Sequence, residues 1–267
     1  MSSIAAMTVA EVNAWLAGKQ GEISADDLAS LRQDQRKGVR QLAERYELNQ
    51  ARAQAERQRV ARMWRLEEKA WAAGYELVAG IDEAGCGPLA GPVVAAAVVF
   101  TQAKPIIGLN DSKQLSETKR EQLYAIIKNE AAAVGVGIIS NQEVDRLNIL
   151  QAAKLAMQQA VQALPLVPNL ALVDGNQARL PNLSLPCRAI LDGDALSASI
   201  AAASIIAKVT RDQLMAELDT VYPGYGFGQH KGYPSREHYA ALHQLGPTPV
   251  HRQTFLRKFY EANRDEH

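Results

Sequence analysis

Residues 77–100 read LVAGIDEAGCGPLAGPVVAAAVVF and contain the pattern that decides the fold. A short apolar run leads into two adjacent acids, Asp82 and Glu83, and then into a turn rich in glycine and proline. A second run of small and β-branched residues follows, so the stretch predicts a strand, an acidic corner, a turn and another strand. Carboxylates beside a flexible turn suit a hard cation such as Mg²⁺ or Mn²⁺. A solvated hairpin corner would have the same pattern, and these two acids alone do not separate the alternatives.

The chain has 267 residues, enough for one sizeable domain and an appendage, and its apolar content of 47% can fill a core. No apolar run approaches the roughly 20 residues of a membrane span. The N-terminal segment lacks a basic start and reaches an acid, Glu11, early, so it is a poor match to a signal peptide. Cys86 and Cys187 match no zinc spacing and cannot form a disulfide framework. We therefore expect a cytoplasmic protein with free thiols and no membrane association.

The N-terminal part of the chain has a distinctive charge. The formal net charge of the whole chain is zero, but residues 30–70 carry eleven Lys and Arg against six Asp and Glu, a net charge of +5. Capping signals at Thr8 and Ser24, and the lack of proline from Asp26 to Ala73, predict an all-helical N-terminal extension over residues 1–73. Its long basic helix is either a solvated spacer or a face that binds nucleic acid.

The pattern after residue 73 predicts a second domain over residues 74–267. Helical patterns separate its expected strands and recur in a C-terminal segment from about residue 220, which includes a helix at about 235–244. This order predicts a mixed five-stranded α/β sheet flanked by helices. The expected strands lie at about 77–82, 91–100, 134–140 and 170–174, and in the run CRAILDGD that ends near Asp194.

The acids of this second domain fall at the ends of expected strands or just beyond them. Asp82 and Glu83 could therefore converge with Asp174 and Asp194 at one edge of the sheet, where ligands of such sheets commonly bind. Four carboxylates without cations would repel one another and raise each other's pKa values. Two divalent ions would remove that repulsion, and such a pair can hydrolyse phosphodiesters without a catalytic His or Ser.

Several long motifs occur in fixed order across residues 77–255, namely GIDEAG, GPLAGPVV, LNDSK, LNIL, VDGN, AAASIIAKVTRD and YGFGQHKGYP. In this order they resemble the ribonuclease HII family. The resemblance implies an RNase H-like fold and an endonuclease that hydrolyses the RNA strand of RNA–DNA hybrids. It also implies nicking of duplex DNA 5′ to embedded ribonucleotides, which leaves 5′-phosphates and serves ribonucleotide and primer removal. The protein would act as a monomer on these nucleic acids.

The same resemblance implies two bound ions, Mn²⁺ or Mg²⁺, with Asp82, Glu83, Asp174 and Asp194 as their ligands. Asp192 competes with Asp194 for the last position, but its neighbours do not fit the family pattern. Some bacterial members carry a helical N-terminal extension, which residues 1–73 resemble.

A substrate-binding set is also implied. Tyr233, in HKGYP, matches the tyrosine that stacks on the sugar at the RNA-to-DNA junction, and Gly85 and Gly87 let the backbone approach that sugar. The family reads Gly, Arg, Gly here, whereas this chain has Cys86 in the middle position and so lacks that cation. Phosphate contacts are implied for four cations in family-like motifs, each of which could also be an ordinary surface charge: Lys113, Lys208, Arg211 and Lys231.

Three alternative interpretations of the sequence can be compared with this one. A nucleotide-cofactor site does not fit, because GCGPLAG is neither GxGxxG nor a Walker A pattern. Cys86 makes a catalytically impaired or silent hybrid-binding module on the same fold plausible, although a binder has no use for four repelling carboxylates. Ribonuclease HIII carries an N-terminal domain with strands that resembles a TATA-box-binding protein, whereas residues 1–70 here predict helices.

Overall fold

The structure is a computed structural model that describes residues 4–19, 23–176, 180 and 183–264. The chain divides into two compact units, Met1–Arg59 and Val60–His267. This division falls before the boundary expected after residue 73, because Met63 and Trp64 are buried in a core of the second unit. Where an independently folding domain begins stays a prediction.

The first unit is helical. A small core of Ile4, Val12, Leu31, Val39 and Ala43 lies among its elements. The capping box of Thr8 with Glu11 and the N-cap at Ser24 are both present. The elements of the N-terminal region are η1 (Ile4–Ala6), α1 (Val9–Gly18), α2 (Ala25–Arg32), α3 (Lys37–Met63) and α4 (Arg65–Ala72).

The lack of proline after Asp26 does not produce one continuous helix. The chain breaks between α2 and α3, where Asp34 accepts hydrogen bonds from the backbone and side chain of Arg36. Such local side-chain bonds compete with helical hydrogen bonding.

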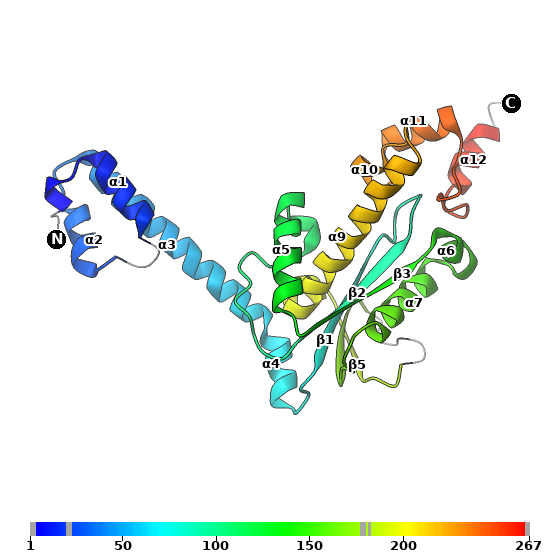
Figure 1. The fold of residues 1–267 in the computed structure, drawn as a ribbon, viewed down its shortest axis with the longest axis horizontal. Coiled ribbons are helices and arrows are strands. Elements are labelled where there is room, and N and C mark those ends of the chain that lie inside the picture. Colours follow the sequence, from blue (N-terminus) through cyan, green and yellow to red (C-terminus); the bar gives the residue numbers. More distant parts are fainter. Residues whose placement is uncertain (1–3, 20–22, 177–179, 181–182, 265–267) are drawn as a thin grey trace. The chain divides into compact units, whose positions relative to one another are not determined.

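The second unit contains a five-stranded sheet in the order β3-β2-β1-β4-β5 (Figure 1). β1 pairs antiparallel with β2 and parallel with β4, so the sheet is mixed, and the predicted fold class is confirmed. β5 ends at Ile190 rather than near Asp194. The strands are β1 (Val78–Ala84), β2 (Val93–Phe100), β3 (Ala133–Ile139), β4 (Leu170–Asp174) and β5 (Cys187–Ile190).

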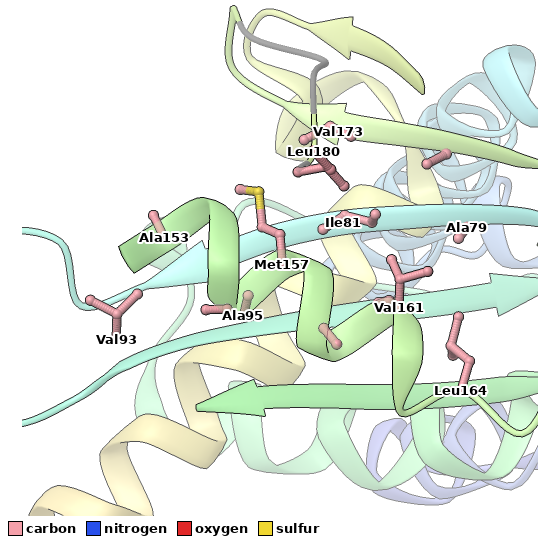
Figure 2. Packing of buried hydrophobic residues seen from close by; sticks show 14 of the residues in the cluster. Ala79, Ile81, Val93, Ala95, Ala153, Met157, Val161, Leu164, Val173 and Leu180 are labelled. Carbon is pink, nitrogen blue, oxygen red and sulfur yellow. The ribbon is translucent and has the colours of Figure 1, made fainter. Parts of the chain in front are cut away.

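Helices cover both faces of this sheet. α7 packs on the face that contains Ala79, Ile81 and Val173 (Figure 2), and α9 packs with α5 on the opposite face. The helical stretch between β3 and β4 is broken at Asn148, whose φ of 69° lies outside the helical range. The elements are η2 (Ser112–Gln114), α5 (Glu117–Glu130), α6 (Asn141–Leu147), α7 (Ile149–Gln162), α8 (Gly193–Leu196), α9 (Ala198–Val221), α10 (Phe227–His230), α11 (Arg236–Leu245) and α12 (Arg257–Arg264).

The close packing of α9 on β1 depends on Gly80. A Cβ at this position would collide with the backbone of Ser199 and Ile200, so only glycine lets the start of α9 lie directly on the strand. α9 therefore passes close to the end of β1, where Asp82 lies. Among the described residues, no helix is long and apolar enough to cross a membrane.

Candidate active site

Asp82 and Asp174 lie side by side because of strand register. β1 and β4 run parallel with Ile81 opposite Val173, so the next residue of each strand is an aspartate. Side chains alternate along a strand, and both acids share the parity of residues that pack beneath α9. Two acids that are 92 positions apart in the sequence therefore lie on the same face at one edge of the sheet.

Hydrogen bonds hold these two aspartates in place. Asp82 accepts the backbone N–H of Glu83 at 2.7 Å and a bond from the Ser204 hydroxyl on α9. Asp174 accepts the backbone N–H of Gly193 at 2.7 Å, which ties the end of β4 to the start of α8. Each aspartate is oriented by these donors.

Asp194 is the third aspartate of the edge and lies in α8, not at a strand end. Its carboxylate is buried, with a relative exposure of 8%, and is close enough to Asp174 for their charges to interact. Asp192, the competing candidate, is exposed and occupies the left-handed position before α8, with φ of 51°. The structure thus places Asp194 among the acids and leaves Asp192 at the surface.

Glu83 follows Asp82 in β1, so its side chain starts toward the other face of the sheet. The Cys86 thiol donates to Glu83 Oε1 over 3.5 Å. Burial, and the neighbouring carboxylate of Glu83, raise the pKa of the Cys86 thiol to about 12, so this cysteine is neutral and unreactive at physiological pH.

The carboxylates of the edge are electrostatically strained. Burial, together with the charges of Glu83 and Asp174, raises the pKa of Asp82 well above its ordinary value. Burial likewise raises the pKa of Glu83, although the bond from Cys86 opposes the change. The pKa of Asp194 rises to about 6 through burial and the charges of Asp111 and Asp174. Each of these groups would be relieved by a cation.

The donor set fits hard divalent cations, because it consists of carboxylate oxygens whose charges repel one another. Among the described residues, no group of three or more potential ligands already encloses a site for a metal ion. That Asp82, Glu83, Asp174 and Asp194 hold metal ions therefore stays a prediction.

A loop beside the acids contains the expected sugar-reading residues. Gly85 has φ of 97°, and a Cβ there would lie 2.8 Å from the Pro92 carbonyl oxygen, so the position requires glycine. A Cβ on Gly87 would lie 3.6 Å from the ring of Tyr233, which places this tyrosine next to the loop. Tyr233 has a relative exposure of 42%. Gly87 and Tyr233 together form an open surface beside the acids.

Two buried arginines hold this loop through its carbonyl groups. Arg211, 1% exposed, donates to the carbonyls of Pro92, Lys231 and Ala90 at 3.0, 2.9 and 3.1 Å. The phosphate contact predicted for Arg211 does not agree with this position, because its guanidinium is enclosed by protein. A sequence motif cannot distinguish an enclosed arginine from a surface one.

Arg252 is the second of these arginines and is fully buried. It donates to the carbonyls of Gly85, Cys86, Gly91 and Pro92 at distances from 2.7 to 3.3 Å. Arg252 thus fixes both ends of the loop, a role that the sequence left open.

The three predicted lysines differ in their surroundings. The side chain of Lys113 is 79% exposed, and its Nζ lies 3.8 Å from Asp194 Oδ2. The exposed ammonium group is therefore available to a phosphate beside the acids. Lys208 bonds both oxygens of Asp212, at 2.5 and 2.6 Å. Lys231 donates to the Gly228 carbonyl and lies 3.6 Å from Glu117. Lys208 and Lys231 are committed to protein partners in this conformation.

Sequence reasoning missed two further polar residues at this edge. Asp111, in the LNDSK motif, accepts the backbone N–H of Lys113 and adds its charge to that of Asp194. Ser204 donates to Asp82 and lies 2.9 Å from the Ser112 hydroxyl. Asp111 lies two positions before Lys113, and Ser204 lies within the motif AAASIIAKVTRD. Both residues were therefore in recognised motifs, but neither follows an expected strand, so the strand-end pattern did not select them.

Comparisons with known proteins agree with this architecture. The chain matches the family model described as Ribonuclease HII over residues 79–261, and the one described as Ribonuclease HII N-terminal domain over residues 8–71. These two matches cover the sheet with its C-terminal helices and most of the N-terminal helices.

Relatives of similar length carry the same name. "Ribonuclease HII" of Desulfitobacterium hafniense (strain Y51) is 48% identical over 255 residues, which are 96% of each chain. That of Enterococcus faecalis (strain ATCC 700802 / V583) is 49% identical over 228 residues, 85% of this chain and 88% of the relative.

Solved structures share the fold. The crystal structure of ribonuclease H2 from Pyrococcus horikoshii OT3 is 30% identical, with a TM-score of 0.57, and the match covers 70% of this chain and 99% of that chain. Bst-RNase HIII in complex with Mn²⁺ is 21% identical, with a TM-score of 0.54 over 72% of this chain and 71% of that chain, a likeness of fold alone. Matched from its N-terminal helices to its C-terminal segment, this chain belongs to the ribonuclease HII family.

Proposed function

We propose that this chain hydrolyses the RNA strand of RNA–DNA hybrids at the edge formed by Asp82, Glu83, Asp174 and Asp194. We further propose that it nicks duplex DNA on the 5′ side of an embedded ribonucleotide and leaves a 5′-phosphate. Membership of the ribonuclease HII family supports the first activity. The observation that carries both is the strained acid cluster beside an open loop at Gly87 and Tyr233.

The four acids would hold divalent cations. We propose that two ions bind there and that either Mn²⁺ or Mg²⁺ serves. Such ions, when bound, lower the pKa of an attacking water and offset the charge that develops on the phosphate. Ser204 and the N–H groups of Glu83 and Gly193 orient the aspartates before any cation arrives.

Discrimination between RNA and DNA depends on the sugar. A 2′-hydroxyl can donate and accept hydrogen bonds, and it distinguishes the two nucleic acids at a given site. The loop at Gly85–Gly87 lets backbone groups approach a sugar, and the exposed ring of Tyr233 offers a surface for stacking. The Lys113 side chain supplies positive charge close to Asp194.

The deciding experiment measures cleavage of a duplex that contains one ribonucleotide, with an all-DNA duplex of the same sequence as control. We expect a single cut 5′ to the ribonucleotide that requires Mn²⁺ or Mg²⁺, a 5′-phosphate on the product and no cut in the control. A single nick with EDTA present would contradict metal dependence. Sedimentation at assay concentrations should show a monomer, and fractionated cells should contain the protein in the cytoplasm.

A second candidate function is a silent hybrid-binding module, which Cys86 makes worth testing. Tight binding of the hybrid without cleavage in either metal would favour it. If the enzyme is active, restoring a cation with Cys86→Arg should lower KM on the single-ribonucleotide duplex by about tenfold, the value of one charge-assisted hydrogen bond. Unchanged KM would show that the lost arginine has no role here.

A further inference from the structure

The C-terminal segment contains three histidines that contact one another. His230 stacks on His238 with ring centroids 4.4 Å apart, and His238 Nε2 lies 3.0 Å from His251 Nε2. His238 and His251 are 0% and 1% exposed, so neither ring is available to solvent. None of the proposed chemistry at the acids uses these rings.

Hydrogen bonds to the backbone determine which nitrogen of each ring carries the proton. The Thr248 backbone N–H can only donate, and it lies 2.9 Å from His251 Nδ1, so this nitrogen is the acceptor. A neutral His251 then carries its proton on Nε2 and donates it to His238 Nε2. His238 in turn carries its proton on Nδ1 and donates it to the Tyr233 carbonyl, 2.9 Å away.

The result is a chain of hydrogen bonds with one direction, from Thr248 through His251 and His238 to Tyr233. Successive bonds of this kind polarise one another. Burial lowers the pKa of both His238 and His251, in agreement with neutral rings. His230 follows the same logic, because its Nδ1 accepts the Gly232 N–H and its Nε2 donates to the Tyr225 carbonyl.

This chain of hydrogen bonds ends at Tyr233, whose ring lies beside the Gly87 loop. The Tyr233 carbonyl also accepts the Ser235 N–H at 2.8 Å, and the Tyr233 N–H donates to the His230 carbonyl at 2.9 Å. The neighbouring Gly232 carbonyl accepts the Leu89 N–H at 2.8 Å, which joins this turn to the glycine loop. These bonds fix the backbone from which the exposed Tyr233 ring extends.

We infer that His238, held in one tautomer by His251, is a positioning residue that orients Tyr233 against the Gly87 loop for recognition of the ribonucleotide sugar. This inference deepens the proposed function and rests on it. His238 touches no substrate, and its whole effect on cleavage passes through Tyr233. Loss of the bond to the Tyr233 carbonyl should therefore impair substrate recognition more than the chemistry at the acids.

Two substitutions separate the bonds of His238. Asn places an amide where Nδ1 lies, so His238→Asn keeps the donor to Tyr233. Gln reaches the position of Nε2, so His238→Gln keeps the partner of His251 and loses the donor to Tyr233. On the single-ribonucleotide duplex we expect His238→Gln to raise KM about tenfold with a smaller change in kcat, and His238→Asn to stay within about threefold of wild type.

A double-mutant cycle with Tyr233→Ala tests whether the effect passes through the tyrosine. His238→Gln should have no further effect on KM when Tyr233 is alanine, because interacting residues are not additive. Equal effects of His238→Gln in both backgrounds, or no effect of Tyr233→Ala alone, would overturn the inference. An inactive wild type would instead reject the proposed function.

A spectroscopic readout remains if His238→Gln does not fold. ¹⁵N NMR of the wild-type imidazoles at pH 7 should show the proton on Nδ1 of His238 and on Nε2 of His251. The opposite tautomers, or a charged ring at either position, would overturn the inference without reference to activity.

Discussion

The two sides of the candidate active site differ in whether the protein supplies partners for its buried charged side chains. At the sheet edge, Asp82 and Asp194 are buried and Glu83 is half-buried, and the pKa values of all three are raised. Beside the adjacent loop, Arg211 and Arg252 are buried just as deeply, but they donate seven hydrogen bonds to six backbone carbonyls. Three bonds come from Arg211 and four from Arg252, and both arginines donate to the Pro92 carbonyl.

The difference distinguishes a functional site from a structural one. A buried charge that is satisfied by the protein fixes the loop, and removing it leaves acceptors unpaired. A buried charge that is left short of partners destabilises the fold but is ready for an external cation. The acids should therefore be needed for activity and dispensable for stability, and the arginines should be needed for stability.

The largest expected effect concerns the identity of the third aspartate. Asp194→Asn should lower kcat on the single-ribonucleotide duplex by about 10³-fold, or roughly 4 kcal/mol, because a cation loses one charged ligand. Asp192→Asn is the matched control, since asparagine tolerates the left-handed conformation at this exposed position. An Asp192→Asn loss as large as that of Asp194→Asn would reverse the assignment.

The next effect is on stability. Arg252→Met should destabilise the second unit by about 3–5 kcal/mol in chemical denaturation, because four carbonyls lose a hydrogen bond and only that of Pro92 keeps another side-chain donor, Arg211. Arg257→Met, at a side chain that is 84% exposed, should change stability by no more than about 0.5 kcal/mol. Similar midpoints for both variants would show that the loop does not depend on Arg252.

The histidines add a dependence on pH. Burial lowers the pKa of His251 from 6.5 to about 4, so the unfolded chain binds its proton first as the pH falls. The stability that neutral His251 contributes is complete above pH 6.5 and is lost between about pH 6.5 and pH 4, by about 3 kcal/mol in total.

Comparison with His251→Asn isolates this contribution. The acids have raised pKa values, so their protonation stabilises the folded protein as the pH falls over part of the same range. This contribution is the same in wild type and variant, so it cancels when their free energies of unfolding are subtracted. Denaturation at pH 7 and pH 4.5 should therefore show a stability difference that shrinks at the lower pH. A difference that is independent of pH would contradict a buried neutral His251.

The smallest effect concerns α3, whose middle section is exposed on most sides. If its basic side chains contact substrate phosphates, the full-length Arg52→Gln/Arg57→Gln protein should bind a hybrid with a weaker salt dependence. The slope of log K against log salt concentration should be shallower by about 2. Gln54→Ala/Gln58→Ala serves as the neutral control on the same helix. Identical slopes for both proteins would identify α3 as a solvated spacer.

The sequence predicts those parts of the molecule that depend on local periodicity. The continuous apolar runs of β1 and β4 predicted these strands, and with them the strand-end positions of Asp82 and Asp174. The helix caps at Thr8 and Ser24 were likewise predictable from residues three positions apart.

The remaining features depend on contacts between distant segments. Arg252 lies at least 160 residues from the carbonyls that it binds, and the enclosure of Arg211 depends on the same loop. Asp194 was expected at a strand end, but the left-handed turn at Asp192 starts a short helix instead. Neither charge nor motif reports which side chains a fold will enclose.

The most direct test of the contrast between acids and arginines measures two properties of Asp82→Asn on one preparation. Without divalent cations, the variant should melt at or above the wild-type temperature, by about 2–4 °C for each kcal/mol of repulsion removed. Its cleavage of the single-ribonucleotide duplex with Mn²⁺ or Mg²⁺ should be lost. A variant that melts several degrees lower, or that still cleaves at the wild-type rate, would contradict the account.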